Sequence, residues 1–245
     1  MKKDMPRLIT LSVAAACLPA VILTLAGCGG GLRPGGPARS TEITRGVFPP
    51  DAEPSGKTYG QWSAAWWQWA LSIATSQNPM LDETGANAGV GQSGPVYFLA
   101  GTMGASVERT CTVPAGKAIL FPIITSFGCV TAPGETVESL TATNKDWIDH
   151  VTELEVNVDG VALTNLGSFR FVAPVFMISF DAVDPLYDIA PGPYTTVSDG
   201  YWIMLEPLSA GQHTIYFRAK IVCPAPTPGG EQVFETSVTY NLTIQ

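Results

Sequence analysis

The clearest pattern in the sequence is an alternation of apolar and polar residues near the end of the chain. Mostly apolar side chains occupy every second position from His213 to Ile221 and again from Phe234 to Ile244. Because successive side chains of a strand point to opposite faces, each segment would bury one face and expose the other. The pattern therefore predicts two strands of an antiparallel sheet that is packed on one side.

Shorter runs of the same kind predict strands earlier in the chain. Residues 107–113 alternate, the segment Pro114-Ala115-Gly116-Lys117 is typical of a turn, and an apolar run resumes over residues 118–125. Pro122 marks an edge or a bulge in the second of these runs. These three segments are predicted to form a hairpin.

A second hairpin is predicted around Asp159-Gly160, which is a favoured two-residue turn. Alternating residues precede it at 154–158 and follow it at 161–163. Further apolar runs that predict strands are residues 95–101, 169–172, 175–180 and 201–205. The total of about eight or nine strands is the number expected for a sandwich or a jelly roll.

One segment has the helical period instead. Apolar residues spaced four, three and four positions apart are Trp62, Trp66, Trp69 and Ile73. This spacing predicts a helix near residues 58–76 that ends before Asn78-Pro79, and its aromatic face must dock on another element because the rings bury large areas. A shorter helix is predicted near residues 143–151.

The fold class that these elements predict is mostly β. We expect an antiparallel β-sandwich, immunoglobulin-like or jelly-roll-like, with the Trp-rich helix packed on it. Residues 28–57 are rich in Gly and Pro and lack apolar periodicity, which predicts a flexible linker. Residues 58–245 are then a single domain.

The start of the chain has the organisation of a secretory signal. A basic segment from Met1 to Arg7 precedes an apolar run over residues 8–25, which ends in Leu25-Ala26-Gly27-Cys28. This motif resembles the lipobox of bacterial lipoproteins. The resemblance implies cleavage after residue 27 and acylation of Cys28. If the cell is Gram-negative, Gly29 after the cysteine implies its outer membrane. An uncleaved membrane-spanning anchor is the alternative.

Charge and composition restrict the partners of the mature chain. The whole sequence carries a net charge of −8, and residues 1–27 carry +2, so the mature chain would carry −10. An acidic surface repels phosphate backbones, so nucleic-acid binding is not expected. No dinucleotide fingerprint or phosphate-binding glycine loop is present, so no cofactor is expected.

Three cysteines would remain in the mature domain beside the acylated one. In an oxidising compartment, Cys111, Cys129 and Cys223 predict one disulfide and one remaining thiol. The sequence allows three pairings, and we favour Cys111 with Cys129, which would hold the loop after residue 125. The remaining thiol is either a buried small hydrophobe or a reactive nucleophile.

Tryptophans are the first candidates for ligand binding. Trp67 lies off the main apolar stripe of the predicted helix, so it is the tryptophan expected to face a ligand. Together with Trp202 and Asp199 it could line a glycan site, because aromatic faces stack on sugar rings. The alternative is that the tryptophans are core residues between helix and sheet.

Acidic residues are the second group of candidates. Asp181, Asp184 and Asp188 lie in one short segment that offers oxygen ligands suited to calcium, although no other metal site is expected. The same carboxylates, or Asp82 and Glu83, could serve as the acid and nucleophile of a glycosidase. Solvated acidic loops are the simpler interpretation.

Three motifs together resemble a group of secreted bacterial proteins of unassigned function. They are Trp62 to Trp69, Cys111 to Lys117 and Asp199 to Trp202. A weaker likeness, over Gly211 to Ile215, is to immunoglobulin-like secreted domains. Neither resemblance implies an activity. The sequence therefore predicts a lipid-anchored binding or structural protein of the cell envelope, with a glycan or protein ligand, and the alternative is a polysaccharide or cell-wall hydrolase.

Overall fold

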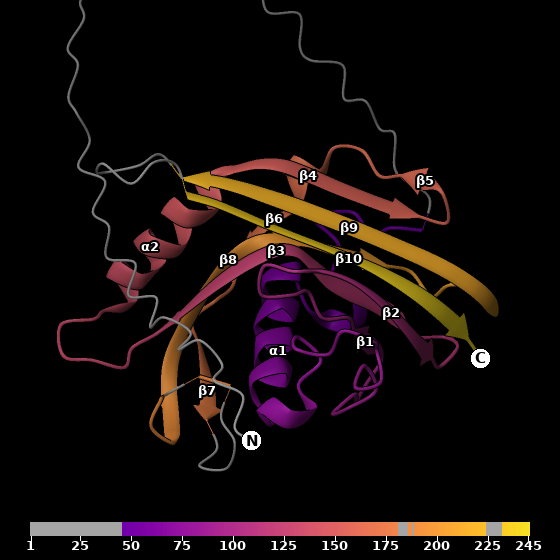
Figure 1. Cartoon of the computed structure of the whole chain (residues 1–245). Coiled ribbons are helices and arrows are strands. Elements are labelled where there is room, and N and C mark those ends of the chain that lie inside the picture. The colour runs from indigo at the N-terminus through magenta and orange to yellow at the C-terminus, as the bar shows by residue number, and fades with distance from the viewer. Residues whose placement is uncertain (1–45, 181–185, 188, 224–231) are drawn as a thin grey trace, which may run out of the picture.

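The computed structural model describes residues 46–180, 186–187, 189–223 and 232–245 (Figure 1). Within these residues the chain forms two α-helices and ten strands, so the prediction of a mostly β protein is confirmed. The helices are α1 (Tyr59–Leu71) and α2 (Val137–Asp149). The strands are β1 (Val96–Phe98), β2 (Ser106–Val113), β3 (Ala118–Cys129), β4 (Val151–Val158), β5 (Val161–Ala162), β6 (Arg170–Val172), β7 (Phe176–Phe180), β8 (Gly192–Leu205), β9 (Gly211–Cys223) and β10 (Gln232–Ile244).

The first sheet, called sheet A, has the strand order β1-β3-β8-β6. Strand β7 also pairs with β8, at the beginning of that strand, so β6 and β7 follow one another along β8. β1 runs parallel to β3, whereas β8 is antiparallel to its neighbours. β8 is therefore the strand on which the rest of sheet A is assembled.

The second sheet, called sheet B, has the order β2-β10-β9-β4-β5. β9 and β10 pair over their full lengths, from Gln232 opposite Cys223 to Ile244 opposite Gly211. Ile215, Phe217, Val238 and Tyr240 are fully buried, as the alternation predicts. The predicted hairpin at Asp159-Gly160 is also present, because β4 and β5 are antiparallel neighbours on either side of this turn.

The molecule has three layers: α1, sheet A and sheet B (Figure 1). Between the sheets, the ring of Phe121 in β3 stacks on that of Phe217 in β9 with centroids 4.9 Å apart. On the opposite face of sheet A, Trp202 of β8 meets Trp66 of α1 at 5.4 Å. Sheet A is thus buried on both faces, while sheet B keeps one face in solvent.

Helix α1 docks through its tryptophans, as predicted. Their indole N–H groups donate to backbone carbonyls outside the helix: Trp62 to Pro54 at 2.9 Å, Trp66 to Leu99 at 3.0 Å and Trp69 to Val90 at 2.9 Å. Each ring is therefore buried with its polar atom paired, which removes the main cost of burying an indole.

The ends of α1 are defined by local hydrogen bonds. A capping box joins Thr58 and Gln61 at the first turn. The helix ends at Leu71, before the predicted residue 76, because the amide of Asn78 donates to the carbonyls of Ala70 at 2.7 Å and Ile73 at 3.1 Å. A short 3-10 helix at Thr75–Gln77 completes the segment.

Helix α2 is longer than predicted and begins six residues earlier, at Val137. A capping box between Thr136 and Ser139 starts it. It lies against β3 and β8, where the amide of Asn144 accepts from Ser126 at 2.7 Å and donates to the carbonyl of Val197 at 3.3 Å. Its docked face also carries Leu140, Trp147 and Ile148, of which Ile148 is buried. The predicted start was too late because the first turns of the helix are polar and mostly exposed.

Two predictions about strand pairing are wrong. β2 and β3 do not form a hairpin: β2 pairs in parallel with β10 in sheet B, and β3 belongs to sheet A. The turn at Pro114–Lys117 crosses between the sheets instead. The sheets are also mixed rather than purely antiparallel, because two pairs, β1 with β3 and β2 with β10, are parallel.

The folded unit begins earlier than the predicted boundary at residue 58. Val47 forms a bridge to Leu205, and the carbonyl of Phe48 accepts a hydrogen bond from the Tyr59 hydroxyl at 2.7 Å. Pro54 is buried beneath Trp62 in a short 3-10 helix, Pro54–Gly56. Residues 46–57 therefore belong to the domain and not to the linker, despite their Pro and Gly content.

Candidate functional site

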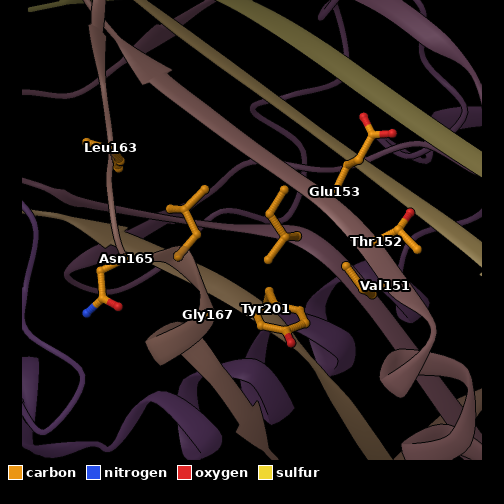
Figure 2. A pocket seen from close by; sticks show the side chains of 9 residues that line it. Val151, Thr152, Glu153, Leu163, Asn165, Gly167 and Tyr201 are labelled. Atoms are coloured by element: carbon orange, nitrogen blue, oxygen red, sulfur yellow. The ribbon is translucent and has the colours of Figure 1, made fainter.

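A pocket opens at the edge of the molecule where β4 of sheet B passes over the end of sheet A (Figure 2). Its volume is about 340 Å³, which is within the size range of small-ligand sites. The residues that line it come from β4, from the segment after β5 and from β8: Val151, Thr152, Glu153, Leu154, Leu163, Asn165, Leu166, Gly167 and Tyr201.

The wall beside β5 is positioned by the hairpin turn. Asp159 and Gly160 have φ angles of 52° and 81°, the left-handed region that this turn requires. The Asp159 carboxylate lies 2.6 Å from His213 Nδ1 and accepts from the Thr214 amide at 2.8 Å. These bonds fasten the turn to the start of β9, and the bond to Asp159 raises the pKa of His213.

Two irregularities shape the pocket. The register of β4 against β9 shifts between Val151 and Glu153, so Thr152 lies in a bulge. Asn165 has φ 57°, a left-handed conformation that Asn tolerates better than most residues, and it starts the 3-10 helix Leu166–Phe169. The bulge and the Asn165 turn face each other across the pocket (Figure 2).

The polar groups available to a ligand are few. The Tyr201 hydroxyl has no hydrogen-bond partner among the described residues, and the side-chain oxygen of Asn165 is likewise unpaired there. Glu153 is already engaged, because Arg218 at 2.6 Å and Lys220 at 3.4 Å bind its carboxylate and lower its pKa. The pocket thus offers one aromatic ring, neutral polar groups and aliphatic side chains.

An ion-pair network lies next to the pocket, beside Tyr201. Arg170 is the cross-strand neighbour of Tyr201, and its guanidinium donates to Asp199 at 2.6 Å and to Asp149 at 2.6 Å. It also donates to the carbonyl of Lys145. Arg170 therefore fastens α2 to β6 and β8, and Asp199, whose side chain is only 3% exposed, is the buried end of this network.

The residues predicted to line a glycan platform lie inside the protein. Trp67 is 5% exposed, packs on Phe127 and donates to the Thr125 hydroxyl at 3.3 Å. Trp202 is fully buried, and its indole N–H has no partner among the described residues. With Asp199 also buried, these residues serve the core and the network, and none of them offers a free surface to a sugar.

The predicted disulfide between Cys111 and Cys129 is not supported, because both are free thiols. They lie in different sheets: Cys111 is opposite Leu242 in sheet B, and Cys129 ends β3 in sheet A beside Thr196. Burial raises the pKa of Cys111 to about 11 and also raises that of Cys129. Both thiols are therefore protonated at neutral pH and are poor nucleophiles.

The other predicted sites are either undescribed or poorly suited to their roles. Cys28 and the calcium candidates Asp181, Asp184 and Asp188 lie outside the described residues. Within the described part, no group of three or more His, Cys, Asp or Glu side chains is arranged to hold a metal ion.

The carboxylate of Asp82, one of the predicted glycosidase residues, is hydrogen-bonded to other residues of its own loop. It accepts hydrogen bonds at 2.8 Å from the amides of Thr84 and Asn87 and from the Thr84 hydroxyl. Burial raises its pKa, but these bonds outweigh burial and leave the pKa below its ordinary value. A general acid needs a raised pKa, so Asp82 does not fit that role. Glu83 is exposed beside it.

Comparison with known proteins gives no relationship: no protein family, no curated protein and no solved structure matches the chain. Among the described residues, no helix is both long enough and apolar enough to cross a membrane. The assignment of function therefore depends on the pocket and on the sequence motifs.

Proposed function

We propose that this protein is a lipid-anchored, extracytoplasmic binding protein of the cell envelope that takes a small glycan in the pocket between β4 and β8. The anchor is proposed on the Leu25-Ala26-Gly27-Cys28 motif, which would attach an acylated Cys28 to a membrane of the cell envelope, the outer membrane if the cell is Gram-negative. We also propose that the two sheets form a β-sandwich of the immunoglobulin-like or jelly-roll-like type.

The observation that carries the glycan ligand is the set of groups in the pocket. Tyr201 offers a ring and an unpaired hydroxyl, and Asn165 offers an unpaired oxygen on the opposite wall. Sugars present both an apolar ring face and hydroxyl groups, so a ring beside neutral hydrogen-bonding groups suits them. The carboxylate of Glu153, the charged residue among those that line the pocket, is already paired with Arg218 and Lys220. This arrangement favours a neutral ligand over a charged one.

Among the residues that the structure describes, no observation favours the hydrolase alternative. Asp82 is held by its loop with a lowered pKa, and Asp199 is neutralised by Arg170. Two carboxyl groups that face each other across one cleft are what glycoside hydrolysis needs. The described residues of the pocket supply a single carboxylate, Glu153, which is bound to Arg218 and Lys220.

The test is binding of the acylated protein to an array of mono- and disaccharides that includes the peptidoglycan disaccharide. Two variants remove single polar groups without removing the fold. Tyr201→Phe deletes only the hydroxyl, and Asn165→Gly deletes the amide while glycine accepts φ 57°. Each is expected to weaken binding of the bound sugar about 5- to 10-fold, the value of one hydrogen bond.

The matched control is Tyr216→Phe, because Tyr216 is half-buried on the solvent face of sheet B and does not line the pocket. This variant should bind like the wild type. Absence of binding to every sugar by the wild type would reject the glycan ligand. Equal affinity of the wild type, Tyr201→Phe and Asn165→Gly would place the binding site elsewhere.

A further inference from the structure

One wall of the pocket belongs to a segment that is joined to sheet B by few backbone contacts. We call this segment, residues 159–167, the β5 flap. Strand β5 forms two residue pairs with β4 and lies at the edge of sheet B, and one further bond joins the amide of Leu163 to the carbonyl of Val156 at 2.9 Å. The buried side chains of Leu163 and Leu166 hold the far end of the flap. The turn at its start is therefore the other point that fixes the pocket wall.

The turn at the start of the flap is held by Asp159. Its amide donates to the carbonyl of Thr214 at 2.9 Å, and its carboxylate accepts from the Thr214 amide at 2.8 Å. The second carboxylate oxygen lies 2.6 Å from His213 Nδ1. Asp159 has φ 52°, in the left-handed region that costs energy for a residue with a side chain. These contacts with β9 therefore stabilise a backbone conformation that is unfavourable by itself.

The imidazole of His213 lies between two hydrogen-bond acceptors, one at each ring nitrogen. Nδ1 faces the Asp159 carboxylate at 2.6 Å, and Nε2 faces the carbonyl oxygen of Ser209 at 3.0 Å. The Ser209 hydroxyl lies 3.3 Å from the same nitrogen. A neutral imidazole carries one N–H, whereas an imidazolium carries two. Only the protonated ring can therefore donate to the carboxylate and to the carbonyl at the same time.

Protonation of His213 therefore decides how firmly the flap is attached. The imidazolium joins the β4–β5 turn to the loop before β9, and its bond to Asp159 is an ion pair. The neutral ring can donate to only one of the two acceptors, and hydrogen bonds between charged groups are roughly twice as strong as neutral ones. Because the Asp159 side chain is 43% exposed, solvent screens part of this pair. Deprotonation should thus loosen the turn by a few-fold change in its equilibrium rather than release it completely.

Asp159 is the charged group that acts on His213 among the described residues. The neighbours of His213 in sheet B are apolar: Leu242, its partner in β10, and Val158 at the end of β4. β3 of sheet A meets β9 through apolar rings. The loop before β9 adds the oxygens of Ser209 and one carboxylate, Glu206, which is exposed. The bond to Asp159 is the main cause that raises the pKa of His213, so the ring stays protonated to a higher pH than a solvated histidine.

We propose that His213 is a pH-dependent clamp on the pocket, which holds the β5 flap in place when it is protonated and loosens the flap when the proton is lost. The regulation of binding that follows rests on the proposed glycan pocket, whereas the change in the flap needs no ligand. Affinity for a sugar should be highest at pH values below the pKa of His213 and should fall as the pH rises through it.

Hydrogen exchange measured by NMR tests the flap in the full chain without ligand. The reporter is the Leu163 amide, which is bonded to Val156, and the control is the Thr110 amide of strand β2, which is bonded to Thr84 at 2.8 Å. Protection factors, from which the intrinsic pH dependence of exchange is removed, are compared at pH 6 and pH 9. The protection of Leu163 is expected to fall about three- to five-fold more than that of Thr110. Equal changes at the two amides would overturn the proposal.

The two histidines of the chain supply a matched pair of variants. His213→Gln removes the titrating group and keeps a neutral donor, so its Leu163 protection should change with pH no more than that of Thr110. His150→Gln removes the other imidazole, whose Nδ1 lies 2.7 Å from the Asp146 carbonyl, and should keep the full change of the wild type. A pH-dependent flap in His213→Gln, or a constant flap in His150→Gln, would assign the effect to another group and overturn the proposal.

Sugar binding is measured separately, with the neutral mono- and disaccharides of the array at pH 6 and pH 9. Neutral sugars carry no group that titrates in this range, so a change in affinity belongs to the protein. The wild type is expected to bind about three- to five-fold more weakly at pH 9, and His213→Gln should bind equally at both values. A flap that loosens while the affinity stays constant would overturn the control of binding. A flap that loosens in a protein that binds no sugar would reject the proposed glycan function and leave the clamp acting on the flap alone.

Discussion

Arg109 is a buried cation whose charge is met by neutral groups. It is 1% exposed, and no carboxylate of the described residues pairs with it. Its guanidinium donates instead to the carbonyls of Asp82 at 2.6 Å, Ala100 at 2.7 Å and Gly101 at 3.1 Å, and to the hydroxyl of Tyr240 at 2.8 Å. It therefore joins two loops to the inner face of sheet B.

Replacing Arg109 should cost far more stability than replacing an arginine of the solvent face. Arg109→Met would leave several buried carbonyls without donors, and we expect the free energy of unfolding to fall by about 3–5 kcal/mol. The control Arg218→Met removes ion pairs that are exposed to solvent and should cost much less than Arg109→Met. Urea titration measures both. Similar losses in the two variants would contradict the role given to Arg109.

For single residues, the sequence indicates which face of a strand a side chain occupies but not which residues that side chain contacts. Arg109 lies two residues after Val107 and four before Val113, so the alternation places it on the same, buried face of β2. Its partners come from residues that are distant in sequence, such as Tyr240. The pocket could not be predicted for the same reason, because Thr152, Asn165 and Tyr201 belong to three separate segments. The left-handed backbone of Asn165, which shapes one wall, also left no mark in the apolar pattern.

Strand β8 holds sheet A together, and its centre has no room for a side chain. A Cβ atom on Gly200 would lie 2.6 Å from the carbonyl oxygen of Ile124 and 2.7 Å from the Cα of Thr125. These atoms belong to β3 immediately after the register shift between Pro122 and Ile124. The close approach of the two backbones is thus a property of the β3–β8 pair.

Gly200→Ala is therefore expected to destabilise the protein by about 1–3 kcal/mol or more, because the contact is with backbone atoms that cannot move aside. The matched control is Gly167→Ala, where an added Cβ meets nothing within 4 Å. It should change stability by less than about 0.5 kcal/mol. Thermal or urea unfolding distinguishes them, and a harmless Gly200→Ala would show that β3 and β8 can separate at this point.

Elements were predicted well where burial followed the apolar pattern and poorly where polar residues are buried. β9 and β10 were evident from alternation. Only the end of β8 was predicted, because its first part buries Thr196, Ser198 and Asp199, which pair with side chains of β3 and β6 or with backbone groups. The supposed hairpin of β2 and β3 failed because a Pro-Gly turn is equally compatible with a crossing between sheets.

The stability of the whole molecule should have a maximum between acid and mildly alkaline pH. Hydrogen bonds from Lys145 and Arg170 lower the pKa of Asp149. A carboxylate with a lowered folded pKa contributes stability above its unfolded pKa, which is about 4, and this contribution is lost as the pH falls through the folded value. His213 behaves oppositely, because its folded pKa is raised by Asp159 and its contribution is lost as the pH rises through that value.

We expect the urea midpoint of the wild type to fall between pH 6 and pH 3, and to fall less in Asp149→Asn. We likewise expect the decline between pH 6 and pH 8 to be smaller in His213→Gln. Urea titrations at the three pH values measure both differences. A variant that keeps the full pH dependence of the wild type would show that the corresponding group does not contribute.

The parallel pairing of β2 with β10 also determines when the fold can be completed. β10 follows every other described strand along the chain, yet it lies between β2 and β9 in sheet B. During synthesis, β2 emerges more than a hundred residues before the neighbour it needs, and such non-local pairing is slow to form. Sheet B therefore cannot be completed before β10 has been synthesised, so β2 has to wait for a partner that is distant along the chain.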